Sequence, residues 1–136
     1  MVSKVPVRSR GKRDGALSWH KFHAKRTETD GHSFASKLEA ALYAQLKLEE
    51  RAGLIRDIQV QDHVYLSDAE ILYIPDFKYT VTATGKSEWA ESKGMETASW
   101  RIKRKLWQTY GPGLLKVFKG SASRIILAEE IIGGGK

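Results

Sequence analysis

A long stretch with helical periodicity, followed by several stretches with strand character, constrains the fold of this chain most strongly. The helical stretch spans residues 33–54, SFASKLEAALYAQLKLEERAGL. Its apolar residues recur at the spacing of one helix face: Leu38, Ala41, Leu42 and Leu46. Ser33 or Ser36 can cap the start of this helix, and Gly53 suits the position after its end, because glycine readily adopts the left-handed backbone found there. The sequence therefore predicts an amphipathic helix whose apolar face is covered by a second layer.

The other segments alternate between strand and helix character. Four of them are rich in β-branched and aromatic residues or alternate in polarity, namely residues 55–66, 71–83, 87–94 and 114–120. Residues 98–111, ended by Gly-Pro-Gly, suit a second helix, and residues 123–132 suit a strand or a short helix. Asp30-Gly31 favours the type I′ turn of a short hairpin within residues 25–34. This order predicts an α/β domain in which helices flank a mixed central sheet.

The charge of the chain narrows the class of its partner. Its 136 residues suit one domain and include 23 lysines and arginines against 16 acidic residues, a formal net charge of +7. This excess favours a nucleic acid as partner, although a basic surface can also serve solubility alone. The chain has no cysteines, no apolar run long enough to span a membrane and no apolar signal core at its start. We therefore expect a soluble cytoplasmic protein without disulfides.

Two basic segments are candidates for contacts with DNA phosphates. Residues 1–18 are expected to form a flexible basic arm ahead of a single domain at 19–136, and the arm's candidate residues are Arg10, Lys12 and Arg13. In the second helix the candidate residues are Arg101, Lys103, Arg104 and Lys105. A disordered tail and a solvated helix face are the simpler explanations of these two segments, and the sequence does not decide between the alternatives.

A helical wheel of the second helix separates its apolar residues from its basic ones. The apolar face is predicted to comprise Ile102, Leu106 and Tyr110, with Trp100 and Trp107 beside them. The opposite face carries Arg101, Arg104 and Lys105. Lys103 falls in the apolar sector, so its ammonium either points toward a phosphate or extends along the apolar surface to solvent.

Three charged residues interrupt the apolar strand segments. Asp76 follows Pro75, and Glu91 and Lys93 are two residues apart, so in a strand their side chains share one face. If the two strands pair, Asp76 and Glu91 come within reach of one cation, and carboxylate oxygens are the ligands that Mg²⁺ prefers. Such an ion can activate water for phosphodiester hydrolysis, with the lysine beside it. The alternative is that these are ordinary charges on a solvated sheet face.

Glu39, near the start of the first helix, has two possible roles. It is the last residue of Ser36-Lys37-Leu38-Glu39, a capping-box pattern in which the glutamate satisfies a backbone N–H of the first turn. It also lies next to the apolar stripe, where it could point over the sheet and complete a metal site. The pattern alone slightly favours the cap.

Glu39, the Pro75-Asp76 dipeptide and Glu91-Ser92-Lys93 together resemble the motifs of the PD-(D/E)xK nuclease superfamily. The stretch 20–61 is similar to small phage-encoded proteins assigned to that superfamily and to the phage junction-resolving endonuclease I. The resemblance covers roughly residues 20–119. It implies a restriction-endonuclease-like core and a bound Mg²⁺ or Mn²⁺. It also implies that Asp76, Glu91, Glu39 and the Ser92 carbonyl are metal ligands, and that Lys93 is the catalytic lysine.

The expected function is therefore a metal-dependent DNA endonuclease that leaves 5′-phosphate and 3′-hydroxyl ends. The resemblance further implies branched DNA as substrate, in the manner of a Holliday junction resolvase, and phage DNA processing in the host cytoplasm. A homodimer would allow symmetric cutting of two strands. A less selective nicking or restriction-type nuclease, a catalytically inert nucleic-acid-binding module and an RNA-directed nuclease are the alternatives.

Overall fold

The computed structural model describes residues 27–135. The predicted arm at 1–18, with Arg10, Lys12 and Arg13, lies outside these residues. The chain divides into two compact units, residues 1–37 and residues 38–136.

In the first unit, two short strands form the predicted hairpin. Strand β1 (Thr27–Thr29) pairs antiparallel with β2 (His32–Phe34), and Thr29 lies opposite His32. The two residues between them both have positive φ, 53° at Asp30 and 79° at Gly31. This is the backbone that a two-residue type I′ turn requires, so the hairpin prediction is confirmed.

Helix α1 (Lys37–Arg51) follows, and the predicted leucine stripe is its buried face. Gly53 has φ 82°, and its N–H donates to the Glu50 carbonyl at 3.0 Å. The next N–H, of Leu54, donates to the Glu49 carbonyl at 3.0 Å. These two bonds form a Schellman motif, so Gly53 ends the helix as the sequence predicts.

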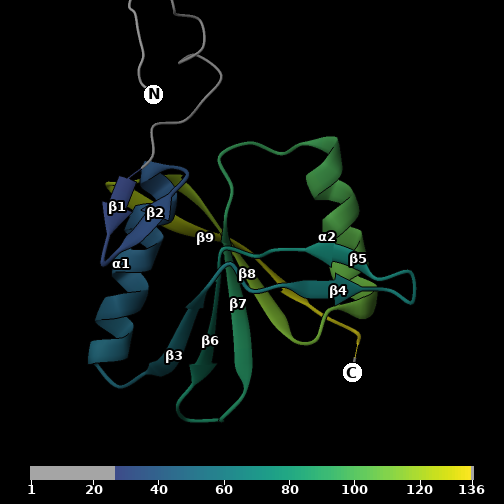
Figure 1. Cartoon of the computed structure of the whole chain (residues 1–136), viewed down its shortest axis with the longest axis horizontal. Helices are drawn as coiled ribbons and strands as arrows, with labels where there is room; N and C mark the ends of the chain where they lie inside the picture. The colour runs from purple at the N-terminus through teal and green to yellow at the C-terminus, as the bar shows by residue number, and fades with distance from the viewer. Residues whose placement is uncertain (1–26, 136) are drawn as a thin grey trace, which may run out of the picture. The chain divides into compact units, whose positions relative to one another are not determined.

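A five-stranded mixed sheet forms the centre of the second unit, in the order β3-β6-β7-β8-β9 (Figure 1). Its strands are β3 (Ile55–Val60), β6 (Phe77–Val81), β7 (Ser87–Ser92), β8 (Leu114–Ser121) and β9 (Arg124–Ile132). The β7–β8 pair is parallel, because helix α2 (Ala98–Tyr110) connects its strands, and the other pairs are antiparallel. The predicted mixed α/β class is confirmed, and residues 123–132 form a strand.

Two of the predicted strands are each divided into two. Residues 55–66 form β3 and β4 (Val64–Leu66), and residues 71–83 form β5 (Ile71–Tyr73) and β6. Strands β4 and β5 pair with each other in a separate two-stranded ribbon. The first break begins at Gln61, whose φ is 57°, and the second contains buried Pro75, which has no N–H to donate to a ladder. The Gln61 N–H donates to the Asp76 carbonyl at 2.8 Å, which ties the two breaks together.

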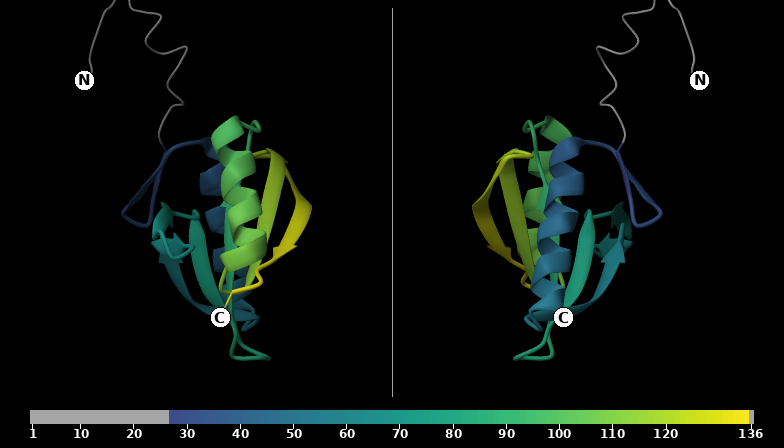
Figure 2. Two further views of the ribbon diagram at one scale, coloured as in Figure 1. Left: turned by 90° about the vertical axis from the view of Figure 1, so that its right-hand side faces the viewer. Right: turned by 90° about the vertical axis from the view of Figure 1, so that its left-hand side faces the viewer.

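The two helices cover opposite faces of the sheet (Figure 2). On the α1 face, the ring of Tyr43 stacks on Phe77 with centroids 5.8 Å apart. On the α2 face, an apolar cluster gathers Trp100 and Trp107 of the helix against the sheet and the β4–β5 ribbon. Its other buried members are Val64, Leu66, Tyr73, Trp89, Leu115, Val117 and Ile131. Among the described residues, no helix is long and apolar enough to cross a membrane.

Helix α2 presents a different face to the core from the one predicted. Its buried residues are Trp100 and Trp107, whereas Ile102 is 59% exposed and Tyr110 is 42% exposed. The seven-residue spacing of the two tryptophans places them on one face, and their larger apolar area decides the rotation of the helix. The Thr97 hydroxyl caps the start of the helix by accepting from the Trp100 N–H at 3.0 Å.

Candidate active site

Asp76 and Glu91 meet at the end of the sheet where β6 begins and β7 ends. The Asp76 backbone N–H donates to Glu91 Oε1 at 3.1 Å. The Ser92 backbone N–H and hydroxyl both donate to Asp76 Oδ2 at 2.8 Å. The expectation that strand pairing brings the two acidic residues together is confirmed.

The strand register explains why these residues meet. Phe77 pairs with Ala90, so the next position beyond this pair brings Asp76 beside Glu91. Asp76 itself immediately precedes β6, in the short connection that contains Pro75 and separates β5 from β6. Its backbone N–H is therefore available to the Glu91 side chain and does not bond to the neighbouring strand.

Lys93 shares a sheet face with Glu91, as the two-residue spacing predicts. Its Nζ lies 3.3 Å from Glu91 Oε2 and 4.9 Å from the ring centroid of Trp100 in α2. The Lys93 side chain is 25% exposed, whereas that of Glu91 is 7% exposed. The lysine therefore lies between a buried carboxylate and solvent, held by one ion pair and one aromatic ring.

Burial destabilises the charged forms of both carboxyl groups. Burial and, to a smaller extent, the nearby charge of Asp76 raise the pKa of Glu91 to about 8, against the lowering effect of Lys93. Burial also raises the pKa of Asp76, against the lowering effect of the hydrogen bonds from Ser92 and the charge of Lys93. A pair of carboxylates with raised pKa values in a confined site has the electrostatic character of a functional site or a cation site.

Tyr73 is a member of this site that the sequence analysis missed. Its ring packs between Trp100 and Trp107, with centroid distances of 6.1 and 5.9 Å. Its hydroxyl is buried without a well-formed hydrogen bond to any described residue. Burial and the negative charge of Glu91 both raise the Tyr73 pKa, so the hydroxyl lies within the field of the carboxylate pair. Its position three residues before Asp76 was the only available signal.

Glu39 is buried at the third position of α1, which is the capping-box position. Helix α1 and β3 are consecutive and run in opposite directions (Figure 1). The helix from Glu39 to its end at Arg51 spans about 18 Å, and the strand segment from Ile55 to Gln61 about 20 Å. Glu39 therefore lies at the end of the sheet where Gln61 contacts Asp76. Along the strand direction Glu39 is therefore near the predicted site, and its side chain comes from the helix on the α1 face of the sheet.

The side chains nevertheless do not form a complete metal centre. Among residues 27–135, no three histidine, cysteine, aspartate or glutamate side chains are grouped closely enough to hold a metal ion. The structure thus brings together Asp76 and Glu91 and leaves Glu39 outside that pair. In an extended strand the N–H and C=O of one residue point to the same side. The Ser92 carbonyl therefore points toward Asp76, as its N–H does.

Parts of the donor set fit a divalent cation of the magnesium type. Two carboxylates and a backbone carbonyl provide hard oxygen ligands, and Mg²⁺ commonly keeps several waters. The raised pKa values of Asp76 and Glu91 show that positive charge from the protein does not fully compensate the pair. The Tyr73 hydroxyl lies beside Glu91 and lowers the pKa of that carboxyl, so it adds a buried hydrogen-bonding group to the site.

The basic residues of α2 have different environments. Arg104 makes a bidentate ion pair with Glu129 of β9, and Arg101 lies 4.0 Å from Glu96. Lys103 Nζ donates to the Leu72 carbonyl at 2.9 Å and lies 5.9 Å from the ring centroid of Tyr73. Lys105 is exposed. The helical wheel predicted that Arg104 lies opposite the core, but in the structure Arg104 flanks the buried tryptophans of α2. Arg101 and Lys105 are exposed, so they are the more accessible cations of the helix.

Comparison with known proteins places the chain in a family without assigning an activity. No curated protein and no solved structure matches it. A family described as a protein of unknown function, DUF1064, matches residues 19–116, which is well over half of the chain. The match includes α1, the Asp76–Glu91 pair, Lys93 and α2. The chain therefore belongs to the DUF1064 family.

Proposed function

We propose that this protein is a metal-dependent DNA endonuclease with a restriction-endonuclease-like core of the PD-(D/E)xK type. The observation that carries the proposal is the meeting of Asp76, Glu91 and Lys93 at one end of the sheet. Asp76 and Glu91, fifteen positions apart, supply one half-buried and one buried carboxylate, and Lys93 follows them in the order and strand context of the superfamily motif. Helix α2 follows the Glu-x-Lys strand, as the resemblance implies.

Asp76, Glu91 and the Ser92 carbonyl would hold Mg²⁺ or Mn²⁺, with Glu39 acting through water. A cation there supplies a more acidic bound water and stabilises the extra negative charge of phosphodiester hydrolysis. Ser92 holds Asp76 in a fixed orientation through two hydrogen bonds. Lys93 orients the attacking water or neutralises charge on the phosphate, because its ammonium lies beside Glu91 and toward solvent.

DNA is the proposed substrate because the chain is basic overall, with a net charge of +7. Branched DNA is the preferred form, and a homodimer the working assembly, on the resemblance to junction-resolving enzymes. In this proposal the exposed cations Arg101 and Lys105 of α2 contact phosphates.

A cleavage assay tests the proposal directly. Supercoiled plasmid, a linear duplex and a synthetic four-way junction are each incubated with the protein in Mg²⁺, Mn²⁺ or EDTA. Lys93→Ala is the test variant. Lys86→Ala is the matched control, because Lys86 is an exposed lysine in the turn at the opposite end of β7. Nicked plasmid is then treated with DNA ligase, which reseals only ends carrying 5′-phosphate and 3′-hydroxyl.

The wild type and Lys86→Ala are expected to cut DNA in a metal-dependent way, and Lys93→Ala is expected to lose cutting. Faster cutting of the junction than of the duplex supports a structure-selective enzyme. Equal cutting of all three substrates retains the nuclease and refutes the junction preference. DNA binding without cutting in either metal refutes the nuclease and supports the inert binding module.

A further inference from the structure

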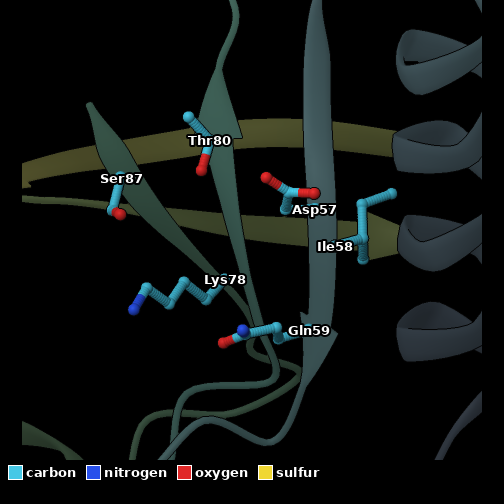
Figure 3. A pocket seen from close by; sticks show the side chains of 6 residues that line it. All are labelled: Asp57, Ile58, Gln59, Lys78, Thr80 and Ser87. Carbon is cyan, nitrogen blue, oxygen red and sulfur yellow. The ribbon is translucent and has the colours of Figure 1, made fainter. Parts of the chain in front are cut away.

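A polar hollow lies on the central sheet, over strands β3, β6 and β7. Figure 3 shows its lining residues, which are Asp57, Ile58, Gln59, Lys78, Thr80 and Ser87. Its volume is about 440 Å³, which is within the range of ligand pockets. Five of the six lining residues are polar or charged, so the hollow suits a polar ligand.

A β-bulge shapes this hollow. The pairing of β3 with β6 shifts register between Arg56 and Gln59, and Asp57 in the shift has φ 58°. Arg56 lies opposite Thr80, and Gln59 lies opposite Lys78. Strand β3 therefore has one extra residue between these two pairs, which allows Arg56 and Gln59 to face the same side of the sheet. Figure 3 shows the Gln59 side chain on this side of β3 and Ile58 on the other side.

The hollow shares its sheet face with the carboxylate pair. Lys78 lies opposite Trp89, and Trp89 is buried in the α2-face cluster and is two residues before Glu91 in the same strand. Lys78 is likewise two residues after Asp76. Two residues of a strand span about 7 Å, so the hollow begins about that distance from the pair. This is close to the separation of neighbouring phosphates along one polynucleotide strand.

The charges and donors in the hollow suit a phosphate. Lys78 Nζ lies 5.5 Å from the Trp89 ring centroid, and Lys78 has no carboxylate ion-pair partner in the part of the chain that the structure describes. Asp57, the only acidic residue among the described ones that line the hollow, accepts from Arg56 at 2.9 Å, which offsets its charge. The Gln59 amide and the hydroxyls of Thr80 and Ser87 add neutral hydrogen-bond donors.

We propose that this hollow binds the DNA-backbone phosphate next to the one at the Asp76–Glu91 pair, with Lys78 as its principal cation. The inference rests on the proposed nuclease, because it identifies how that site would hold its substrate strand. The hollow thereby sets the register of the strand, while the carboxylate pair and Lys93 act on the neighbouring phosphate.

The test measures binding separately from cleavage. Fluorescence anisotropy of a short labelled DNA duplex in EDTA gives the Kd of wild type, Lys78→Gln and Thr80→Val over a range of salt concentrations. Arg51→Gln is the matched control, because Arg51 is an exposed cation at the last turn of α1 and outside the hollow. Thr80→Val removes the hydroxyl and suits a strand, so it tests the hollow if Lys78→Gln folds poorly.

Loss of one phosphate contact lowers the slope of log K against log salt concentration by about 0.9. For Lys78→Gln this means a Kd about eightfold higher in about 0.1 M salt and nearly unchanged in about 1 M salt. Thr80→Val is expected to raise Kd without changing the slope, and Arg51→Gln to change neither.

The outcomes separate this inference from the nuclease. Wild-type cleavage together with an unchanged salt slope in Lys78→Gln overturns the hollow and leaves the nuclease intact. A reduced slope without cleavage in any metal supports the hollow as a DNA contact and refutes the nuclease. An equal loss of slope in Arg51→Gln overturns the inference, because the effect would then be one of general charge.

Discussion

Replacing Glu91 by glutamine should stabilise the metal-free protein at alkaline pH. Glutamine keeps the shape of the side chain and an oxygen that can accept from the Asp76 N–H, but it cannot ionise. In the wild type, Glu91 is 6% exposed, and burial and the charge of Asp76 raise its pKa from 4.5 to about 8. The variant therefore removes a buried charge that the fold tolerates poorly.

The pH dependence follows from proton binding in the two states. The unfolded chain releases the Glu91 proton near pH 4.5, whereas the folded protein retains it until about pH 8. Between these values the native state binds more protons, so the free energy of unfolding falls as pH rises. At about 1.4 kcal/mol per pH unit, the total loss is about 5 kcal/mol. Glu91→Gln lacks this loss, and the missing ion pair of partly exposed Lys93 costs at most about 1 kcal/mol.

Urea denaturation followed by circular dichroism in EDTA, from pH 5 to pH 9, measures this effect. We expect the two proteins to be of similar stability near pH 5 and the variant to be increasingly more stable above it. Parallel stability curves across this range would refute the reasoning. Addition of Mg²⁺ at pH 8 should raise the stability of the wild type more than that of Glu91→Gln, because only the wild type supplies both carboxylates.

Two further pairs of substitutions test the packing and the charge distribution of α2. Trp107→Ala should lower the free energy of unfolding by about 3–5 kcal/mol in urea, because Trp107 is fully buried and donates to the Gly113 carbonyl at 2.9 Å. Ile102→Ala, at a 59% exposed position, should change it by less than about 0.5 kcal/mol; equal effects would contradict the observed helix face. In a gel shift, Lys105→Ala should weaken DNA binding more than Arg104→Ala, because Glu129 already holds Arg104. The reverse order would show that this ion pair opens on binding.

Local chemistry was sufficient for several elements of the fold. The Asp30-Gly31 turn, the leucine face of α1 and its end at Gly53 each depend on residues adjacent in sequence or one helical turn apart. Backbone sterics and helical spacing determine such features, and both can be read without knowledge of the rest of the chain. The same applies to the shared face of Glu91 and Lys93, which follows from strand alternation.

The sequence misplaced features that depend on distant partners. The rotation of α2 was predicted from Ile102 and Tyr110, but Trp100 and Trp107 pack against Trp89 and its neighbours from other elements. The two long strand segments were predicted as continuous, yet each breaks where the chain leaves the central sheet for the β4–β5 ribbon. Apolar periodicity identifies what can be buried, and it does not identify which surface buries it.

For the candidate site, the sequence by itself determined which groups could act: two carboxylates, a lysine and their order along the chain. Tertiary structure alone decided their relations. The register of β6 with β7 brought Asp76 to Glu91, burial raised both pKa values, and packing of α2 added Tyr73 and Trp100. It also left Glu39 outside the pair. The physical reason is that charge type is a property of one residue, whereas distance and desolvation are properties of the folded assembly.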